Sequence, residues 1–230
     1  TSPERQRQAM DAVEAQLVDP AHGLIRLLDP PLQHAQPSAG YIQAYPPGVR
    51  ENGGQYAHAG VWALMAAAAL AQREPGNAAA QDTPYRYFTY LSPAHRAAHP
   101  QWGETYGVEP YVMAADVYSA PPYEGRGGWS WYTGAAGWLH RAAVGSILGL
   151  EIGAEDLFFT PCLPLHWPRA ELTLLRDGRH MRFLLVRGEA VAALADCAEP
   201  HAQLLNVGER LRWTDLPQSS CFVVPLPPGN

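Results

Sequence analysis

The sequence has little charge: Asp, Glu, Lys and Arg make up only 17% of its 230 residues, below the quarter usual in globular domains. Sixteen basic residues against 22 acidic ones give a formal net charge of −6. This balance argues against general binding to nucleic acid or to an anionic membrane surface. It remains compatible with a local anion site, because net charge describes the whole chain and not one pocket.

Cysteine is also scarce, and long apolar runs are missing. Cys162, Cys197 and Cys221 are widely spaced and form no Cys-x-x-Cys pair, so neither a zinc site nor a disulfide framework is indicated. We expect buried or free thiols in a reducing compartment, and hence a cytoplasmic location. Residues 1–5 are charged and lack the apolar region of a signal peptide. The longest apolar run, residues 61–71, is about half of the roughly 20 residues that a membrane span needs.

Several catalytic motifs are absent. There is no Gly-x-Ser-x-Gly, no His-Glu-x-x-His, no Walker loop and no dinucleotide fingerprint. The commonest hydrolase, metalloprotease and nucleotide-binding classes are thereby disfavoured, and no metal site or cofactor is predicted. The chain starts without Met and directly in a predicted helix, so we expect a piece of a longer protein.

Glycine (21), proline (22) and apolar residues (47%) are plentiful, which predicts a compact body with long, structured loops. Loops are expected at residues 19–52, 92–108 and 121–128, and loops of this length are usually functional. Apolar spacing and capping residues predict helices over 3–18, 55–73 (buried on most sides), 78–91, 111–118 and 133–150.

The periodicity changes after about residue 160. Residues 171–176 and 181–187 flank Asp177-Gly178, which predicts a β-hairpin. Further short strands are expected at 191–195, 203–207 and 221–224. We therefore expect a mainly α chain with a helical domain over residues 1–160 and a small antiparallel β domain over residues 161–230.

Polar side chains gather at the junction formed by residues 48–58. A Gly pair there permits close backbone approach, and the helix start that follows favours an anion. Taken alone, His58 is as well explained as a satisfied core histidine. The other candidates at this junction are Arg50, Glu51, Asn52 and Tyr56.

A second junction, residues 125–134, leads into the next helix. The amides of Thr133 and Gly134, with the Thr hydroxyl, could cradle an oxyanion at the helix N-terminus. The alternative is that Thr133 is a simple N-cap. Trp131 and its neighbouring tryptophans offer flat faces that suit either sugar rings or a core.

A third junction carries Glu109, followed by Asp116. The two could act as a carboxylate pair, or each could make structural hydrogen bonds.

These motifs together resemble glycoside hydrolase family 94. The resemblance covers nearly the whole chain, and residues 114–118 and 125–129 are most similar to the phosphorylase-like C-terminal region of cyclic β-1,2-glucan synthases. It implies the last part of an (α/α)6 barrel followed by a C-terminal β domain. Family members are inverting phosphorylases acting on β-linked glucosides. The matching segments are residues 40–42, 45–48, 50–58, 109–112 and 127–134.

The resemblance also implies roles for residues. His58, Thr133 and Gly134 match phosphate ligands, and Glu109 and Trp131 match neighbours of the sugar site. The pocket itself would be lined by Arg50, Glu51, Asn52 and Tyr56. No cofactor is implied, since inorganic phosphate is a substrate. The implied partners are a β-linked glucan or oligosaccharide, phosphate, the upstream catalytic portion of the same protein and, for the full enzyme, a second copy. The full-length parent is expected at the inner membrane.

The sequence departs from the family in one respect. The Gly-Asp-Trp-Asn-Asp-Gly-like motif, whose carboxylic acid protonates the glycosidic oxygen, does not occur in these 230 residues. We therefore expect part of a glycosyltransferase-type phosphorylase that releases α-glucose 1-phosphate, with no catalytic residue in this chain. The alternatives are a non-catalytic carbohydrate-binding or chain-length-control module and a phosphate-independent glycoside hydrolase of toroidal fold.

Overall fold

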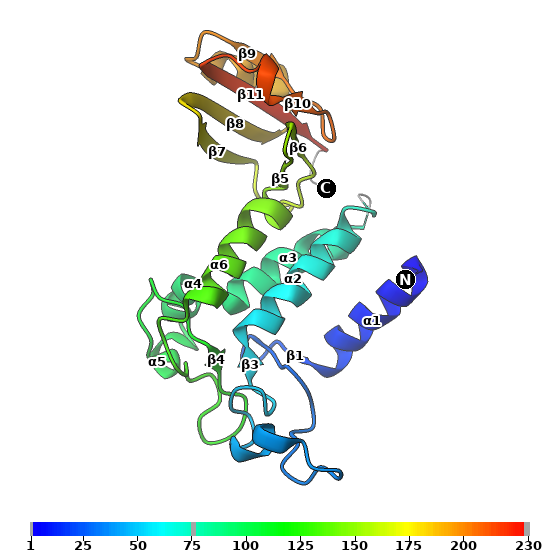
Figure 1. Ribbon diagram of the computed structural model, residues 1–230, viewed down its shortest axis with the longest axis vertical. Helices are drawn as coiled ribbons and strands as arrows, with labels where there is room; N and C mark the ends of the chain where they lie inside the picture. The colour runs from blue at the N-terminus through cyan, green and yellow to red at the C-terminus, as the bar shows by residue number, and fades with distance from the viewer. Residues whose placement is uncertain (1, 75–76, 228–230) are drawn as a thin grey trace.

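Helices dominate the first part of the chain and strands the last part in the computed structural model, which describes residues 2–74 and 77–227 (Figure 1). The α-helices are α1 (Pro3–Gln16), α2 (Ala57–Ala71), α3 (Ala78–Leu91), α4 (Pro93–Ala98), α5 (Gly103–Tyr106), α6 (Thr133–Arg141) and α7 (Ala190–Ala193). Shorter helical turns are η1 (Gly40–Ala44), the π-helical η2 (Ala142–Ile147), η3 (Leu194–Asp196) and η4 (Trp213–Asp215). The helices of the described residues all fall short of the length and apolarity that crossing a membrane requires.

Local signals fix the helix ends. The Ser2 hydroxyl accepts a hydrogen bond from the Arg5 amide at 3.4 Å, and the Asn77 side chain accepts one from the Ala80 amide at 3.2 Å. Both are the N-cap interactions that satisfy orphan donors. Helix α3 ends at Leu91 because Pro93 keeps the preceding residue out of the helical region. The predicted helices at 3–18 and 55–73 are thus confirmed with slightly shorter bounds, and the helix at 78–91 is confirmed with the predicted bounds.

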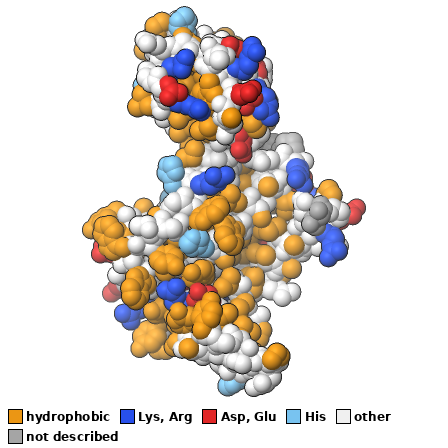
Figure 2. Space-filling view, viewed as in Figure 1, with side chains coloured by type: hydrophobic (Ala, Val, Ile, Leu, Met, Phe, Trp, Pro, Cys, Tyr) orange, Lys and Arg blue, Asp and Glu red, His pale blue; other side chains and the backbone are white. Residues whose placement is uncertain are grey.

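Helix α2 is the centre of the helical part. Its Val61 and Leu64 are fully buried against Tyr87 and Leu91 of α3. The expectation that this helix is buried on most sides is confirmed, because only Trp62, Ala66 and Ala69 are exposed. These three residues form one open stripe, on which Trp62 is 53% exposed. Figure 2 shows hydrophobic side chains spread over the helical part, with charges of both signs on the sheet part.

The strands form two larger sheets and two short ladders. The short ladders pair β1 (Val18–Asp19) with β2 (Leu24–Ile25), and β3 (Gln55–Tyr56) with β4 (Asp116–Val117). A three-stranded antiparallel sheet has the order β10 (Leu211–Arg212), β6 (Asp156–Phe159), β5 (Leu150–Ile152). The four-stranded sheet has the order β7 (Arg169–Arg176), β8 (Arg179–Arg187), β11 (Ser219–Leu226), β9 (Ala202–Leu204).

The predicted hairpin is confirmed. Strand β7 pairs antiparallel with β8, and Asp177 and Gly178 connect them with φ angles of 51° and 74°. Positive φ at both central residues gives the turn that matches the twist of a hairpin. The expectation of a purely antiparallel β part is wrong, because β11 runs parallel to both β8 and β9. Parallel pairing needs a long crossover, and the chain from Gly188 to Gln218 supplies it.

The two larger sheets share a core. Phe159 of β6 lies 4.8 Å from Phe183 of β8 between ring centroids, and Phe183 stacks on Phe222 of β11 at 5.2 Å. This apolar cluster continues into α2 and α3. The strands of the sheet part begin at Leu150, and a domain boundary at residue 160 stays a prediction.

Two predicted elements are wrong. Residues 111–118 form no helix: Asp116 and Val117 pair with Tyr56 and Gln55, so tertiary pairing overrides the helical tendency of Ala114-Ala115. Residues 191–195 form no strand but lie in α7 and η3, as their alanine content favours.

The cysteine expectation is wrong in part. Cys197 and Cys221 form a disulfide with Cα atoms 5.9 Å apart, whereas Cys162 is free and buried. The disulfide joins the end of η3 to the third residue of β11. The cysteines therefore no longer support a reducing, cytoplasmic location.

Candidate functional site

The helices α2 and α6 both begin at the end of the helical part that faces away from the two larger sheets (Figure 1). His58 is the second residue of α2 and Gly134 the second residue of α6. The two residues touch: a Cβ atom added at Gly134 would lie 3.2 Å from Cε1 and 3.4 Å from Nε2 of the imidazole. Two junctions that are 76 positions apart in sequence thus meet at one place.

Thr133 lies beside this contact as the exposed first residue of α6. The N-cap of the helix is Tyr132, and no side chain caps the helix there. The alternative that Thr133 is a simple N-cap is therefore wrong. Amides in the first turn of a helix lack partners within the helix, so this end offers donors to an anion.

His58 is half-buried and surrounded by aromatic rings rather than enclosed in the core. It stacks on Tyr56 at 6.1 Å and meets Tyr132 edge-on at 5.9 Å and Trp62 at 6.3 Å, all between ring centroids. The core-histidine interpretation therefore fails. The rings fix the imidazole on the side that faces α6.

Arg50 lies in a tight turn before α2 and has a left-handed backbone with φ of 49°. Its guanidinium carbon stands over the rings of Tyr45, Tyr56 and Tyr132 at 5.6, 5.8 and 5.9 Å from their centroids. Its Nε lies 3.5 Å from the Glu51 carboxylate. Such distances fit cation–π contacts. The rings of Tyr45, Tyr56 and Tyr132 thus form an aromatic box around the Arg50 cation, and the Glu51 carboxylate lies beside that cation.

Two residues of this box were not predicted from the sequence. Tyr45 belongs to the motif at 45–48, and Tyr132 directly precedes Thr133. Their position inside these matching motifs was the signal in the sequence that could have identified them. Their contribution depends on tertiary contacts that spacing does not reveal.

Protonation states in the box follow from its contacts. The Tyr56 and Tyr132 hydroxyls lie 3.3 Å apart, and this hydrogen bond, with burial, raises the pKa of Tyr56 to about 12. Burial opposes the charge on Arg50, but the Glu51 carboxylate and the Tyr132 hydroxyl outweigh it and raise the pKa of the guanidinium. At neutral pH the box therefore presents the Arg50 cation beside a neutral Tyr56 phenol.

Asn52 occupies a framework position. Its side chain is fully buried, where Oδ1 accepts from the Leu32 amide at 2.6 Å and Nδ2 donates to the Tyr45 carbonyl at 2.8 Å. Both polar groups are therefore used inside the loop. Asn52 shapes the box and does not face its surface.

The remaining candidates lie at the rim or beneath the box. Glu109 is exposed, and Trp131 is 67% exposed with its ring 6.4 Å from that of Tyr111. Asp116 is buried and accepts a hydrogen bond from the Arg50 amide at 2.7 Å. Of the two interpretations for this carboxylate, the structural hydrogen bond is the one observed.

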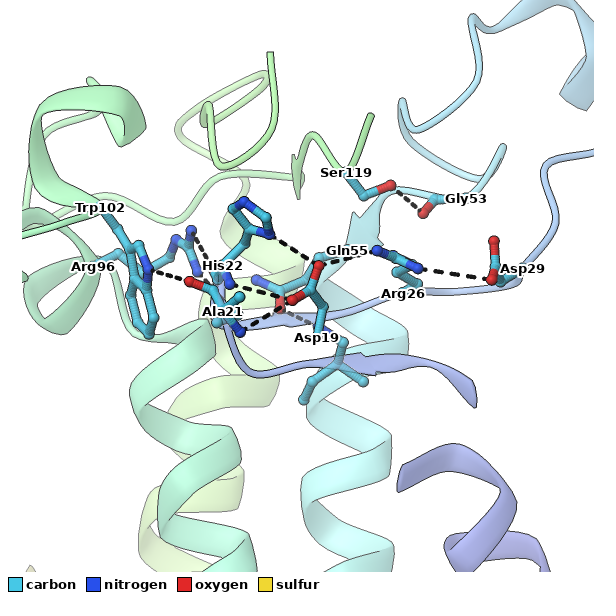
Figure 3. Close-up of polar contacts among 12 residues, drawn as sticks. Asp19, Ala21, His22, Arg26, Asp29, Gly53, Gln55, Arg96, Trp102 and Ser119 are labelled. Atoms are coloured by element: carbon cyan, nitrogen blue, oxygen red, sulfur yellow. Dashed lines mark hydrogen bonds and ion pairs between the residues drawn. The ribbon is translucent and has the colours of Figure 1, made fainter. Parts of the chain in front are cut away.

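Buried polar side chains hold the loops below the box (Figure 3). Gln55 accepts from the Ile25 amide at 2.8 Å and donates to the Tyr90 carbonyl at 3.1 Å. Ser119 donates to the Gly53 carbonyl at 2.7 Å. Each of these contacts joins segments at least 30 positions apart, so the loops form one rigid support.

Arg96 is a second support and is fully buried. Its NH1 group donates to the Gly23 and Tyr90 carbonyls at 2.6 and 3.2 Å. Its guanidinium faces the rings of Trp102 and Tyr106; Figure 3 shows Arg96 beside Trp102. Burial lowers the pKa of Arg96 to about 10. The guanidinium still carries its charge at neutral pH and joins the β1–β2 turn to the end of α3.

Comparison with known proteins gives related sequences. The chain is 43% identical over 203 residues to the cyclic beta-(1,2)-glucan synthase NdvB of Rhizobium meliloti (strain 1021), covering 86% of this chain and 7% of that protein. It is 30% identical over 174 residues to the N,N'-diacetylchitobiose phosphorylase of Vibrio proteolyticus, covering 75% of this chain and 20% of that protein. It is also 30% identical over 177 residues to the solabiose phosphorylase of Paenibacillus borealis, covering 76% and 21%.

The chain therefore spans about a fifth or less of the length of these relatives. Residues 1–149 match the family model described as "Glycosyl hydrolase 94 superfamily, catalytic domain". These residues include both helix starts and every residue of the aromatic box. The family predicted from the motifs is confirmed, and the chain belongs to the glycosyl hydrolase 94 superfamily.

Proposed function

We propose that this chain supplies the phosphate- and sugar-binding part of an inverting glycoside phosphorylase or glucan synthase. The observation that carries the proposal is the contact of His58 with Gly134 at two helix starts. An imidazole donor, the Thr133 hydroxyl and free helix amides would converge there on one anion. The relatives named above, two phosphorylases and a glucan synthase, support this reading.

The chemistry needs such an anion site. An inverting hydrolase uses one carboxylic acid for the leaving group and one base for water. Phosphate is already an anionic nucleophile, so the base is unnecessary once phosphate is held in line with the anomeric carbon. A phosphate oxygen then bonds to that carbon as the glycosidic C–O bond breaks, and α-glucose 1-phosphate results from a β-linked glucan. Positioning and charge neutralisation are the contribution of His58, Thr133 and Gly134.

The sugar would lie against the aromatic box. Arg50, Glu51 and Tyr56 combine charge, hydrogen-bonding groups and flat apolar faces at a half-buried surface. Such a mixture suits a sugar ring, whose C–H face packs on aromatics while its hydroxyls bond to polar groups. Exposed Trp131 and Glu109 would extend this surface at the rim.

The proton for the leaving oxygen comes, in this proposal, from a carboxylic acid outside these 230 residues. The helices α1 to α6 would form the last part of an (α/α)6 barrel, and the acid would belong to the remainder of the same protein. A homodimer of the full enzyme is part of the same proposal.

Phosphate-dependent turnover tests the proposal. The natural protein, incubated with inorganic phosphate and β-1,2-linked glucooligosaccharides, cellobiose or N,N'-diacetylchitobiose, should release an α-sugar 1-phosphate from at least one of them. His58→Ala should raise the phosphate KM or lower kcat at least about tenfold, the loss of one charge-assisted hydrogen bond. His140→Ala, an exposed histidine of α6, is the matched control and should change neither.

Other outcomes separate the alternatives. Sugar release without phosphate would identify a hydrolase, and glucan binding without turnover would identify a binding or chain-length-control module. Either result would overturn the proposed function.

A further inference from the structure

A buried carboxylate that the proposed reaction does not use lies directly beneath Arg50. Asp116 is 1% exposed, and its Oδ2 accepts the Arg50 amide at 2.7 Å. Its Oδ1 has no hydrogen-bond partner in the described part of the chain. Burying an ionisable group with an unpaired oxygen costs free energy, so Asp116 needs a structural or functional role that offsets this cost.

Asp116 joins three segments that build the site. In β4 it pairs with Tyr56 of β3, directly before α2 and His58. Its carbonyl accepts the Gly128 amide at 2.9 Å, in the loop that leads to α6. A Cβ atom at Gly128 would overlap the Asp116 carboxylate, so the loop approaches this side chain as closely as a residue without a side chain allows.

The third segment is the turn that carries Arg50. A non-glycine residue with positive φ is uncommon and strained, and it persists only where its surroundings hold it. The Arg50 backbone is held by the Asp116 carboxylate on its amide and by the Gly54 amide, 3.1 Å from its carbonyl. Both hydrogen bonds favour the conformation that turns the guanidinium over Tyr45, Tyr56 and Tyr132.

We propose that Asp116 is the positioning residue for Arg50: its buried carboxylate fixes the left-handed backbone of Arg50 and thereby aims the guanidinium into the aromatic box. Asp116 touches no substrate in this scheme and acts only through Arg50. The part of the inference that concerns sugar binding rests on the proposed function, whereas the part that concerns the conformation of Arg50 does not.

A double-mutant cycle separates positioning from simple support. Asp116→Ala and Arg50→Ala are made singly and together in the natural protein, and the KM for the oligosaccharide that supports phosphate-dependent turnover is measured. Each single variant should raise KM about tenfold. The double variant should be no worse than Arg50→Ala alone, because the second change has nothing left to disturb.

Three further variants extend the cycle. Asp116→Asn keeps an acceptor oxygen for the Arg50 amide and should stay within about threefold of wild type. Ser119→Ala removes a buried hydrogen bond to Gly53 in the same loop but does not touch Arg50. The fold increases in KM caused by Ser119→Ala and by Arg50→Ala should therefore multiply when the two changes are combined. Asp116→Leu, of similar shape and without an acceptor oxygen, replaces Asp116→Ala if the latter does not fold.

A crystal structure of Asp116→Ala or Asp116→Leu gives a readout that needs no activity. Arg50 should leave positive φ, and its guanidinium should leave the three tyrosine rings. An unchanged Arg50, or effects of Asp116 and Arg50 on KM that multiply fully, would overturn the inference. Absence of phosphate-dependent turnover in the wild type would instead defeat the proposed function, and the crystal structure would still decide the role of Asp116.

Discussion

The imidazole of His58 lies against the backbone of Gly134, with only 3.2 Å between Cε1 and the place where a Cβ atom would stand. Glycine is therefore the residue that lets the α6 helix start approach the histidine of α2. In the proposed function, this approach creates an anion site with donors from two helices. The proposed phosphate site depends on this contact more than on any other pair of residues in the chain.

The disulfide should contribute measurably to stability. Cys197 and Cys221 are 24 positions apart, and closing a loop of this size typically stabilises a protein by about 2–4 kcal/mol. We expect reduction with a thiol reagent to lower the free energy of unfolding by that amount, measured by denaturant titration. Reducing the Cys162→Ala variant should lower its free energy of unfolding by the same amount, because the free Cys162 takes no part in the disulfide. Equal unfolding curves with and without reductant would show that the bond contributes nothing.

The buried Asp116 should make stability depend on pH. Burial raises its pKa, against the opposing hydrogen bond and charge of Arg50. The folded protein therefore binds this proton more tightly than the unfolded chain, so the stabilising contribution is complete below the unfolded pKa of about 3.9 and is lost as pH rises through the folded pKa.

Asp116→Asn removes this titration and gives the measurement. The free energy of unfolding of the variant minus that of wild type should increase as pH rises above about 4, and then level off. Ser119→Ala, which removes a hydroxyl that does not titrate, should differ from wild type by a constant amount over the same range. A difference for Asp116→Asn that falls with rising pH would contradict the assigned direction.

Local rules predicted a good share of the molecule. Asp177-Gly178 identified the hairpin because its two positive φ angles are a property of those residue types. Ser2 predicted the start of α1 for an equally local reason, as its N-cap. The meeting of His58 with Gly134 was implied by the resemblance of the motifs and not by spacing.

Other features depend on distant parts of the chain. The parallel pairing of β11 with β8 depends on the crossover between them, which no strand pattern encodes. Ala114-Ala115 favours a helix locally, yet β3 pairs with the residues that follow it. Tyr132 belongs to the site because its ring contacts the His58 ring and the Arg50 guanidinium in the folded chain. The disulfide joins two cysteines that the spacing had left unpaired.

The most direct test of the anion site is the phosphate KM of Gly134→Ala, measured beside Gly137→Ala in the same helix. A Cβ atom at Gly137 meets no atom within 4 Å, whereas one at Gly134 presses on the His58 ring. Alanine favours a helix by up to about 1 kcal/mol over glycine, so neither variant should lose much helix stability. The account predicts that Gly134→Ala stays folded and raises the phosphate KM at least about tenfold, while Gly137→Ala leaves it unchanged. An unchanged phosphate KM in folded Gly134→Ala would contradict the claim that His58 and Gly134 hold phosphate together.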